Sequence, residues 1–157
     1  MGVSAEMTGI IELRRKEGCS CVIRNGSETR TFHERGVKDL YRLLNEEPSF
    51  LAGSIIADKV VGTAAASLMV LGGVRLLFAE TISKPALELA NAGGMAVEYD
   101  TVVPHIINRS NTDWCPLEKL CFDADTATEC LERIAGFMAG NDKMKNSRTT
   151  GGSLSAL

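Results

Sequence analysis

Two adjacent charged residues, Asp58 and Lys59, stand where an apolar run predicts the end of a strand and the start of a helix. An Asp at this place is most often an N-cap, which accepts hydrogen bonds from free backbone N–H groups. A helix N-terminus also binds anions or a developing oxyanion, and Lys59 would add a positive charge. Gly62 and Thr63 follow in a small-residue run, which suits either close helix packing or a ligand near the backbone.

Further polar residues are expected at the same edge of the sheet. Glu80 and Thr81 follow the next predicted strand, and ligands of open α/β sheets bind outside the carboxyl ends of the strands. If the segment 101–119 folds over this edge, it adds polar candidates, namely Asn108, Arg109, Cys115, Glu118 and Lys119. Arg109 suits a phosphate or carboxylate, although Asn108 and Arg109 also suit the backbone of their own loop. Glu118 and Lys119 also fit a surface ion pair.

One cysteine, Cys115, is a candidate for a chemical role. Cys115 precedes Pro116 at an expected helix start, where a thiol pKa falls, so it is either a reactive cysteine or a buried thiol. The chain has 5 Cys, and this odd number without a secretory signal predicts reduced thiols and a cytoplasmic protein. The gap between Cys115 and Cys121 is too wide for a zinc knuckle, so we predict no metal.

Strands and short helices alternate across glycine turns in the elements that must position these residues. Asn25-Gly26 predicts a tight hairpin between strands 19–24 and 29–34. Later strands are expected at 53–57, 74–79 and 95–99, and helices at 4–16, 37–47, 58–71, 84–92, from 116, and 125–138. This order predicts an α/β protein with a mixed five-stranded sheet, the hairpin first and parallel strands after it, and helices on both faces.

Length, composition and charge limit the number of domains and the kinds of partner that the chain is expected to have. With 157 residues, 45% of them hydrophobic, we expect one domain over 1–139 and a disordered tail over 140–157, which lacks apolar density. The formal net charge of -3 and the absence of a dense basic run argue against an extended nucleic-acid partner. The apolar run 64–71 is too short for a membrane span. Exposed sheet edges and hydrophobic helices are compatible with a homodimer.

Several stretches carry a family resemblance. The order of elements over residues 4–99, with "AAASLMVLGGVRLLFAE", resembles the cytidine deaminase-like fold, a three-layer sandwich. "IADKVVGTAAA", "PALELANAGG" and "IINRSNTDWCPLEK" are similar to an uncharacterised prokaryotic family with that fold, whose members share the ADKVVG, Asn-Arg and CPxEK stretches. The resemblance reaches about residue 119 and implies no established activity.

The chain departs from the zinc site that a deaminase needs. Such a site takes one His or Cys at one helix start, a C-x-x-C pair at the next, and a Glu two residues after the first ligand. Here Glu34 follows His33 directly, and Val60-Val61-Gly62-Thr63 stands where the two thiolates are expected. We therefore predict no catalytic zinc and no cofactor.

Three functional interpretations remain. The first is a protein of deaminase-like fold that binds a small anionic metabolite or nucleotide at the corner formed by Asp58 and Lys59. The second is an enzyme, a hydrolase or transferase, that uses Cys115 or the Asp58/Lys59 pair. The third is an interaction protein whose pocket is vestigial.

Overall fold

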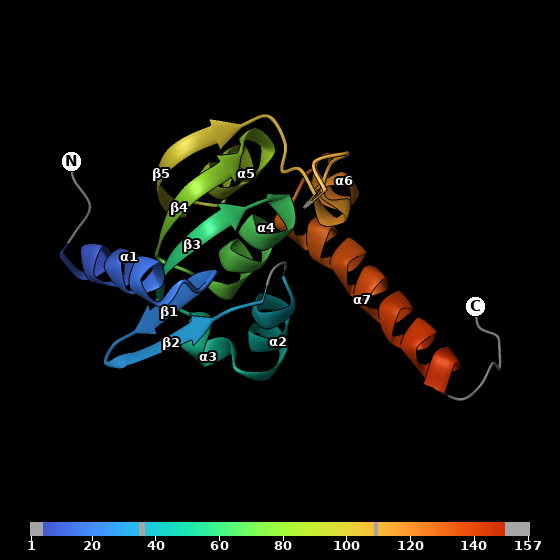
Figure 1. Cartoon of the computed structure of the whole chain (residues 1–157), viewed down its shortest axis with the longest axis horizontal. Coiled ribbons are helices and arrows are strands. Elements are labelled where there is room, and N and C mark those ends of the chain that lie inside the picture. The colour runs from blue at the N-terminus through green and yellow to red at the C-terminus, as the bar shows by residue number, and fades with distance from the viewer. Residues whose placement is uncertain (1–4, 35–36, 109, 150–157) are drawn as a thin grey trace.

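The centre of the molecule is a twisted five-stranded sheet (Figure 1). The structure is a computed structural model that describes residues 5–34, 37–108 and 110–149. The strand order is β2-β1-β3-β4-β5, with bounds β1 Cys21–Asn25, β2 Glu28–Phe32, β3 Ile55–Val61, β4 Leu76–Ser83 and β5 Ala96–Val103. β1 pairs antiparallel with β2 and β3, and β3, β4 and β5 run parallel. The predicted mixed α/β sheet is confirmed.

Helices cover both faces of the sheet and make three layers (Figure 1). On one face α1, Ala5–Glu17, packs Met7, Ile10 and Ile11 on a cluster that includes Val22 and Phe78. The main core lies on the other face, among helices whose bounds are α2 Lys38–Glu46, α3 Pro48–Leu51, α4 Thr63–Gly72, α5 Lys84–Ala92, α6 Pro116–Cys121 and α7 Ala127–Thr149. α4 is the central helix, buried from Thr63 to Met69.

The hairpin forms where the sequence predicted it, but its turn lies one residue later. Asn25 pairs with Glu28, so the two loop residues are Gly26 and Ser27. Gly26 has a φ of 62°, as a hairpin with glycine at the first loop position requires. The Asn25 side chain donates instead to the carbonyl oxygens of Phe50 at 2.8 Å and Ala52 at 2.9 Å. Asn25 therefore joins the hairpin to α3 and does not shape the turn.

The corner at Asp58 differs from the prediction. Asp58 and Lys59 lie inside β3, which continues to Val61, and α4 begins only at Thr63 with Gly62 as its N-cap. The extra residues stay in the strand because Val60 and Val61 pair with Thr81 and Ile82 of β4. The predicted helix cap at Asp58 was wrong, and this carboxyl is available for another role.

Close packing explains the small residues at the helix ends. A Cβ added at Gly72, the last residue of α4, would lie 2.9 Å from Leu51 Cδ1. A Cβ added at Gly93, after α5, would lie 2.6 Å from Val70 Cγ1 of α4. Real Cβ atoms do not approach so closely, so these glycines let α3, α4 and α5 pack against one another.

The last helix, α7, begins beside α6 and leads away from the sheet toward the C-terminus (Figure 1). Its backbone stays helical to Thr149, beyond the predicted domain end at 139. Disorder from residue 140 onward and the division at 139 stay predictions. Within the described residues, no helix is long and apolar enough to cross a membrane. The predicted helix start at Ser4 lies outside the described residues.

Candidate functional site

A cavity of about 390 Å³ lies between the sheet, α2, the start of α4 and the start of α6. Its walls are mainly apolar and include Ile23, Phe32, Val37, Leu40 and Leu117. The loop after β5 closes one side with Ile106 and Ile107. Ligand pockets have volumes of roughly 300–1,000 Å³ and the same mixture of apolar walls and few polar groups. The cavity is therefore the candidate functional site.

Asp58 is the most deeply buried aspartate in this cavity. β3 holds it directly opposite Cys21 of β1, and only 9% of the residue is exposed. The Val60 backbone N–H donates to Asp58 Oδ1 over a long 3.4 Å. Burial raises the pKa of Asp58 to about 7, since desolvation disfavours the carboxylate. Asp58 thus exchanges a proton near neutral pH, where an ordinary aspartate is fully ionised.

Cys21 is a thiol in this environment. Burial raises its pKa first, and the neighbouring Asp58 charge raises it further. A nucleophilic cysteine needs the opposite shift, toward the thiolate. Cys21 is therefore a packed wall residue rather than a nucleophile.

Glu118 occupies the N-terminus of α4. The residue is 1% exposed, and its Oε1 accepts hydrogen bonds from the Thr63 backbone N–H at 2.8 Å and the Thr63 hydroxyl at 2.9 Å. Its Oε2 accepts from the backbone N–H of Ile106 at 3.0 Å. The helix tip that the sequence presented as an anion site is thus satisfied by the chain's own carboxylate. Glu118 also ties the loop after β5 to α4.

The remaining charges in the cavity lining are mostly acidic. Glu34 and Asp39 line the cavity together with Asp58 and Glu118, and Lys59 is the one basic residue among the described lining residues. Asp39 has a cation nearby, Arg42, at 3.9 Å. The described part of the cavity thus presents more carboxyl groups than cations.

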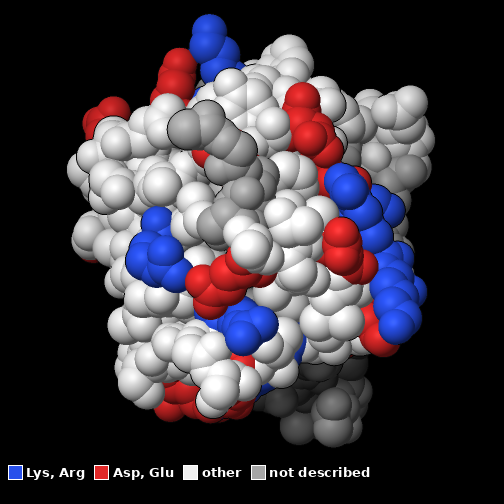
Figure 2. Space-filling view, turned by 90° about the vertical axis from the view of Figure 1, so that its left-hand side faces the viewer, with Lys and Arg blue, Asp and Glu red and all other residues white. Residues whose placement is uncertain are grey.

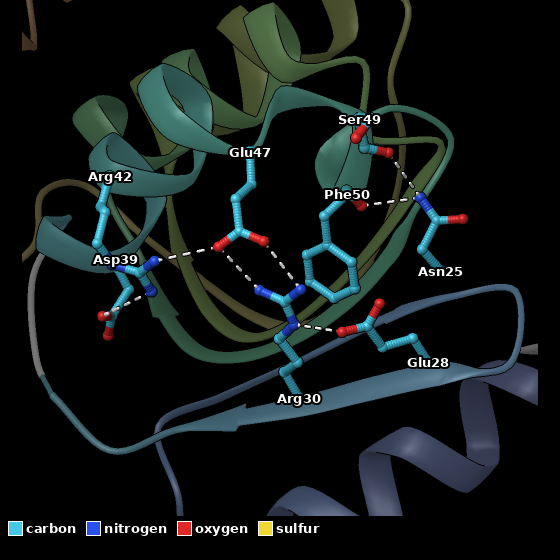
Figure 3. Close-up of polar contacts among 8 residues, drawn as sticks. All are labelled: Asn25, Glu28, Arg30, Asp39, Arg42, Glu47, Ser49 and Phe50. Carbon is cyan, nitrogen blue, oxygen red and sulfur yellow. Dashed lines mark hydrogen bonds and ion pairs between the residues drawn. The ribbon is translucent and has the colours of Figure 1, made fainter.

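Ionic contacts join β2 to the end of α2 (Figure 3). Arg30 of β2 donates to both carboxylate oxygens of Glu47, at 3.0 and 3.2 Å, and to Glu28 at 2.7 Å. Its guanidinium carbon lies 4.0 Å from the centre of the Phe50 ring. Hydrogen bonds from Arg30 lower the pKa of Glu47, which keeps this carboxylate ionised. The network ties β2 to the end of α2, and so holds two elements that line the cavity.

Six of the predicted site residues line this one cavity, namely Asp58, Lys59, Gly62, Asn108, Cys115 and Glu118. Thr63 lies beside them, bonded to Glu118. The loop that carries Asn108 and Cys115 does fold back toward β3, and the Cys115 N–H donates to the Ile106 carbonyl at 2.8 Å. The segment after β5 therefore lines the same cavity as Lys59, an arrangement that the sequence left open.

The other predicted site residues lie elsewhere. Glu80 forms an ion pair with Arg14 of α1. Thr81 lines an adjoining, more open hollow of about 480 Å³ beside Trp114, which shares Val60, Ile106 and Ile107 with the cavity. Lys119 is exposed and pairs with Asp113. Arg109 lies outside the described residues.

Sequence reasoning missed part of the lining. Glu34 and Asp39 come from the segments around the start of α2, and Cys21 comes from β1. Cys21 lies next to Asp58 because of the antiparallel register of β1 and β3, which pairs these two residues. No sequence signal fixes that register, because the two strands are separated by the hairpin and two helices.

Metal ligands do not cluster in the part of the chain that the structure describes. No three His, Cys, Asp or Glu side chains there are arranged to hold an ion. His33 is exposed, and Val61 packs in the core at the place where the resemblance calls for a thiolate. The absence of zinc and of any cofactor stays a prediction.

One face of the molecule, on the side of α1, carries mixed charge (Figure 2). Blue and red side chains alternate across it, with a run of blue along its right-hand edge that has red groups beside it. Among the ion pairs of α1, Arg15 has Glu80 at 3.3 Å and Asp100 at 3.5 Å.

Fold and site together define an α/β protein with a mixed sheet and an apolar, acid-lined cavity. Residues 9–138 match the model of a protein family described as a domain of unknown function, DUF1893. The chain belongs to this family. It is similar to a solved crystal structure of a DUF1893 family protein from Thermotoga maritima, with 28% sequence identity and a TM-score of 0.78. The match covers 86% of this chain and 92% of that one. No curated protein matches the chain.

Proposed function

We propose that this protein binds a small organic metabolite in the cavity beside Asp58. The main support for this function is the cavity itself, which has a volume of about 390 Å³ and is lined by apolar side chains together with a few convergent polar groups. A packed core rarely leaves such a space, because interiors are filled to the density of organic crystals. The apolar walls suit the body of a ligand, and Asp58 and Lys59 suit its polar head.

The sequence pointed to an anionic metabolite or nucleotide, and Lys59 is the group that would meet such a charge. Glu118 weighs against it, because this carboxylate already accepts the hydrogen bonds that the start of α4 offers. The proposal is therefore binding of a small molecule in the cavity, with an anion as one class to be tested.

A thermal-shift screen of metabolites with a matched pair of variants tests this function. Ala65→Leu fills space in the cavity, since Ala65 lines it from α4, whereas Ala92→Leu adds the same atoms at an exposed position on α5. A true ligand raises the unfolding midpoint of the native chain and of Ala92→Leu, but not of Ala65→Leu. A blank result with anionic, neutral and cationic metabolites would contradict the proposal and favour an interaction protein.

Catalysis is a second candidate because Cys115 lies at the cavity. It is half-buried, whereas the other four cysteines are buried. Thiol labelling of the folded protein tests this use. Faster reaction of Cys115 than of free cysteine supports a hydrolase or transferase, and slower reaction argues against a nucleophile.

A further inference from the structure

The cavity contains carboxyl groups whose charge is already balanced and others whose charge is not. Glu118 accepts three hydrogen bonds, and Asp39 has Arg42 nearby. Glu34 and Asp58 form no ion pair with any described residue. Among the described carboxyl groups of the lining, these two have neither an ion pair nor a side-chain donor.

Asp58 is the more informative of the two because it is nine-tenths buried. Its hydrogen bonds come only from the backbone. The Val60 N–H donates over a long 3.4 Å, and the Lys59 N–H, which also donates to the Ser20 carbonyl at 3.0 Å, helps to lower the pKa of Asp58. No side chain donates to it among the described residues. A buried carboxyl is normally matched by a donor or a cation, and the open space of the cavity is where such a group would sit.

We propose that the cavity takes an organic cation, an amine or amidine on an apolar body, with its head group bound by the Asp58 carboxylate and its body against Ile23, Phe32 and Leu117. This inference rests on the proposed function and specifies its ligand class. Glu34, exposed at the cavity, attracts the same charge. Lys59 is also exposed, so its ammonium group is free to turn toward water.

Because Asp58 gains or loses its proton near neutral pH, the change of ligand affinity with pH shows whether the ligand is a cation or an anion. With a pKa of about 7, Asp58 is largely protonated at pH 6 and largely ionised at pH 8. A bound cation favours the ionised form, so its affinity rises with pH, whereas an anion shows the opposite trend. The other ionisable groups near this region are Cys21 of β1, Arg14 of α1, Lys59, Glu34, Asp39 of α2, Cys115 before α6 and Glu118 of α6.

Three probes with one ring and different head groups test the inference, namely benzamidine, benzyl alcohol and benzoate. Binding is followed by shifts of the backbone amide signals of the full chain in nuclear magnetic resonance titrations. We expect benzamidine to bind about tenfold more tightly than benzoate at pH 8, because charge-assisted hydrogen bonds are the strong ones. Its affinity should fall on the order of tenfold at pH 6.

The variants Asp58→Asn and Glu88→Gln show whether Asp58 is responsible. Asn keeps the size of the side chain, so Asp58→Asn should bind benzamidine and benzyl alcohol alike and lose the pH trend. Glu88 is exposed on α5, so Glu88→Gln should behave as the native chain. Preference for benzoate, or an unchanged preference in Asp58→Asn, overturns the cation inference and leaves the cavity as a binding site. Absence of binding by all three probes at millimolar concentration overturns both.

Discussion

At the scale of single residues, Asp58 makes stability depend on pH. Its pKa is about 7 in the folded chain and near the ordinary value of 3.8 when unfolded. Between these values the folded state binds more protons than the unfolded state, so the contribution of Asp58 to stability is fully present below its ordinary pKa and is lost as the pH rises to 7. The loss is on the order of a few kcal/mol, since each unit of pKa difference is worth about 1.4 kcal/mol.

Asp58→Asn removes this ionisation, so we expect the variant to gain stability relative to the native chain as pH rises from 5 to 8. Urea unfolding at both pH values measures the difference. Glu88→Gln, at an exposed position, is the matched control and should show no such trend. A difference between Asp58→Asn and the native chain that is equal at the two pH values would contradict the assigned burial.

Glu118 holds the loop after β5 against the start of α4. Glu118→Gln replaces one acceptor oxygen by an NH₂ group, so one of the bonded N–H groups, of Thr63 or Ile106, faces another donor. We expect a loss of about 1–3 kcal/mol in the free energy of unfolding. Lys119→Gln changes the next residue, whose exposed ion pair contributes little, and serves as control. Equal stability of the two variants in urea would show that Glu118 is not a cap.

The sequence could suggest the neighbourhood of these residues but not their roles. CPLEK predicted a short helix at Pro116, which is confirmed as α6. That Glu118 reaches Thr63, 55 residues away, has no local signal, and a Glu next to a Lys looks like a surface pair. The burial of Asp58 was hidden for the same reason, because an Asp before small residues also fits a helix cap.

At the scale of elements, Gly62 sets how closely α4 approaches α6. A Cβ there would lie 3.2 Å from Glu118 Oε1 and 3.3 Å from Ile106 Cγ1. Gly62→Ala should therefore push the Glu118 carboxylate away from the start of α4 and cost about 1 kcal/mol or more. Gly136→Ala, in α7 with nothing within 4 Å, should instead stabilise the chain by about 0.5–1 kcal/mol.

Thermal and urea unfolding of the two alanine variants tests this contrast. Opposite signs are expected, because one methyl group meets the Glu118 cap and the other only improves helix propensity. Two stabilising substitutions would show that the contact between α4 and α6 is loose.

The elements themselves were largely predictable, and their ends were not. The hairpin signal at Asn25-Gly26, the short buried run 53–57 and the glycines after α4 and α5 placed every strand and the helix Lys84–Ala92. The parallel strands all run beyond their predicted ends, to Val61, Ser83 and Val103. Local apolar runs stop earlier, but ladder pairing such as Ile82 with Val102 continues the strands through polar residues. Tertiary pairing therefore overrides the local pattern at the edge where the cavity lies.

At the scale of the whole molecule, the cavity is bounded on one side by the well-paired strand β3, its floor, and on another by a cover that fewer contacts hold in place. β3 is paired on both sides, and Ile55, Ile56 and Ala57 are at most 1% exposed. The cover is the loop after β5 and the six-residue α6, which Glu118 and a few backbone bonds hold in place. Segments with few buried contacts open at lower free energy than core strands. A ligand should therefore enter from the side of α6 and not through the sheet.

Amide hydrogen exchange tests this ordering in the native chain. We expect the amides of Ile55–Ala57 to exchange only on global unfolding, and those of Ile106 and Cys115 to exchange faster by local opening. Glu118→Gln should speed exchange at Ile106 selectively, because it weakens the bond to that N–H while the pairing of β3 stays intact. If β3 and the α6 cover exchange at one common rate, the cover opens only when the whole domain unfolds, and the entry route proposed here is wrong.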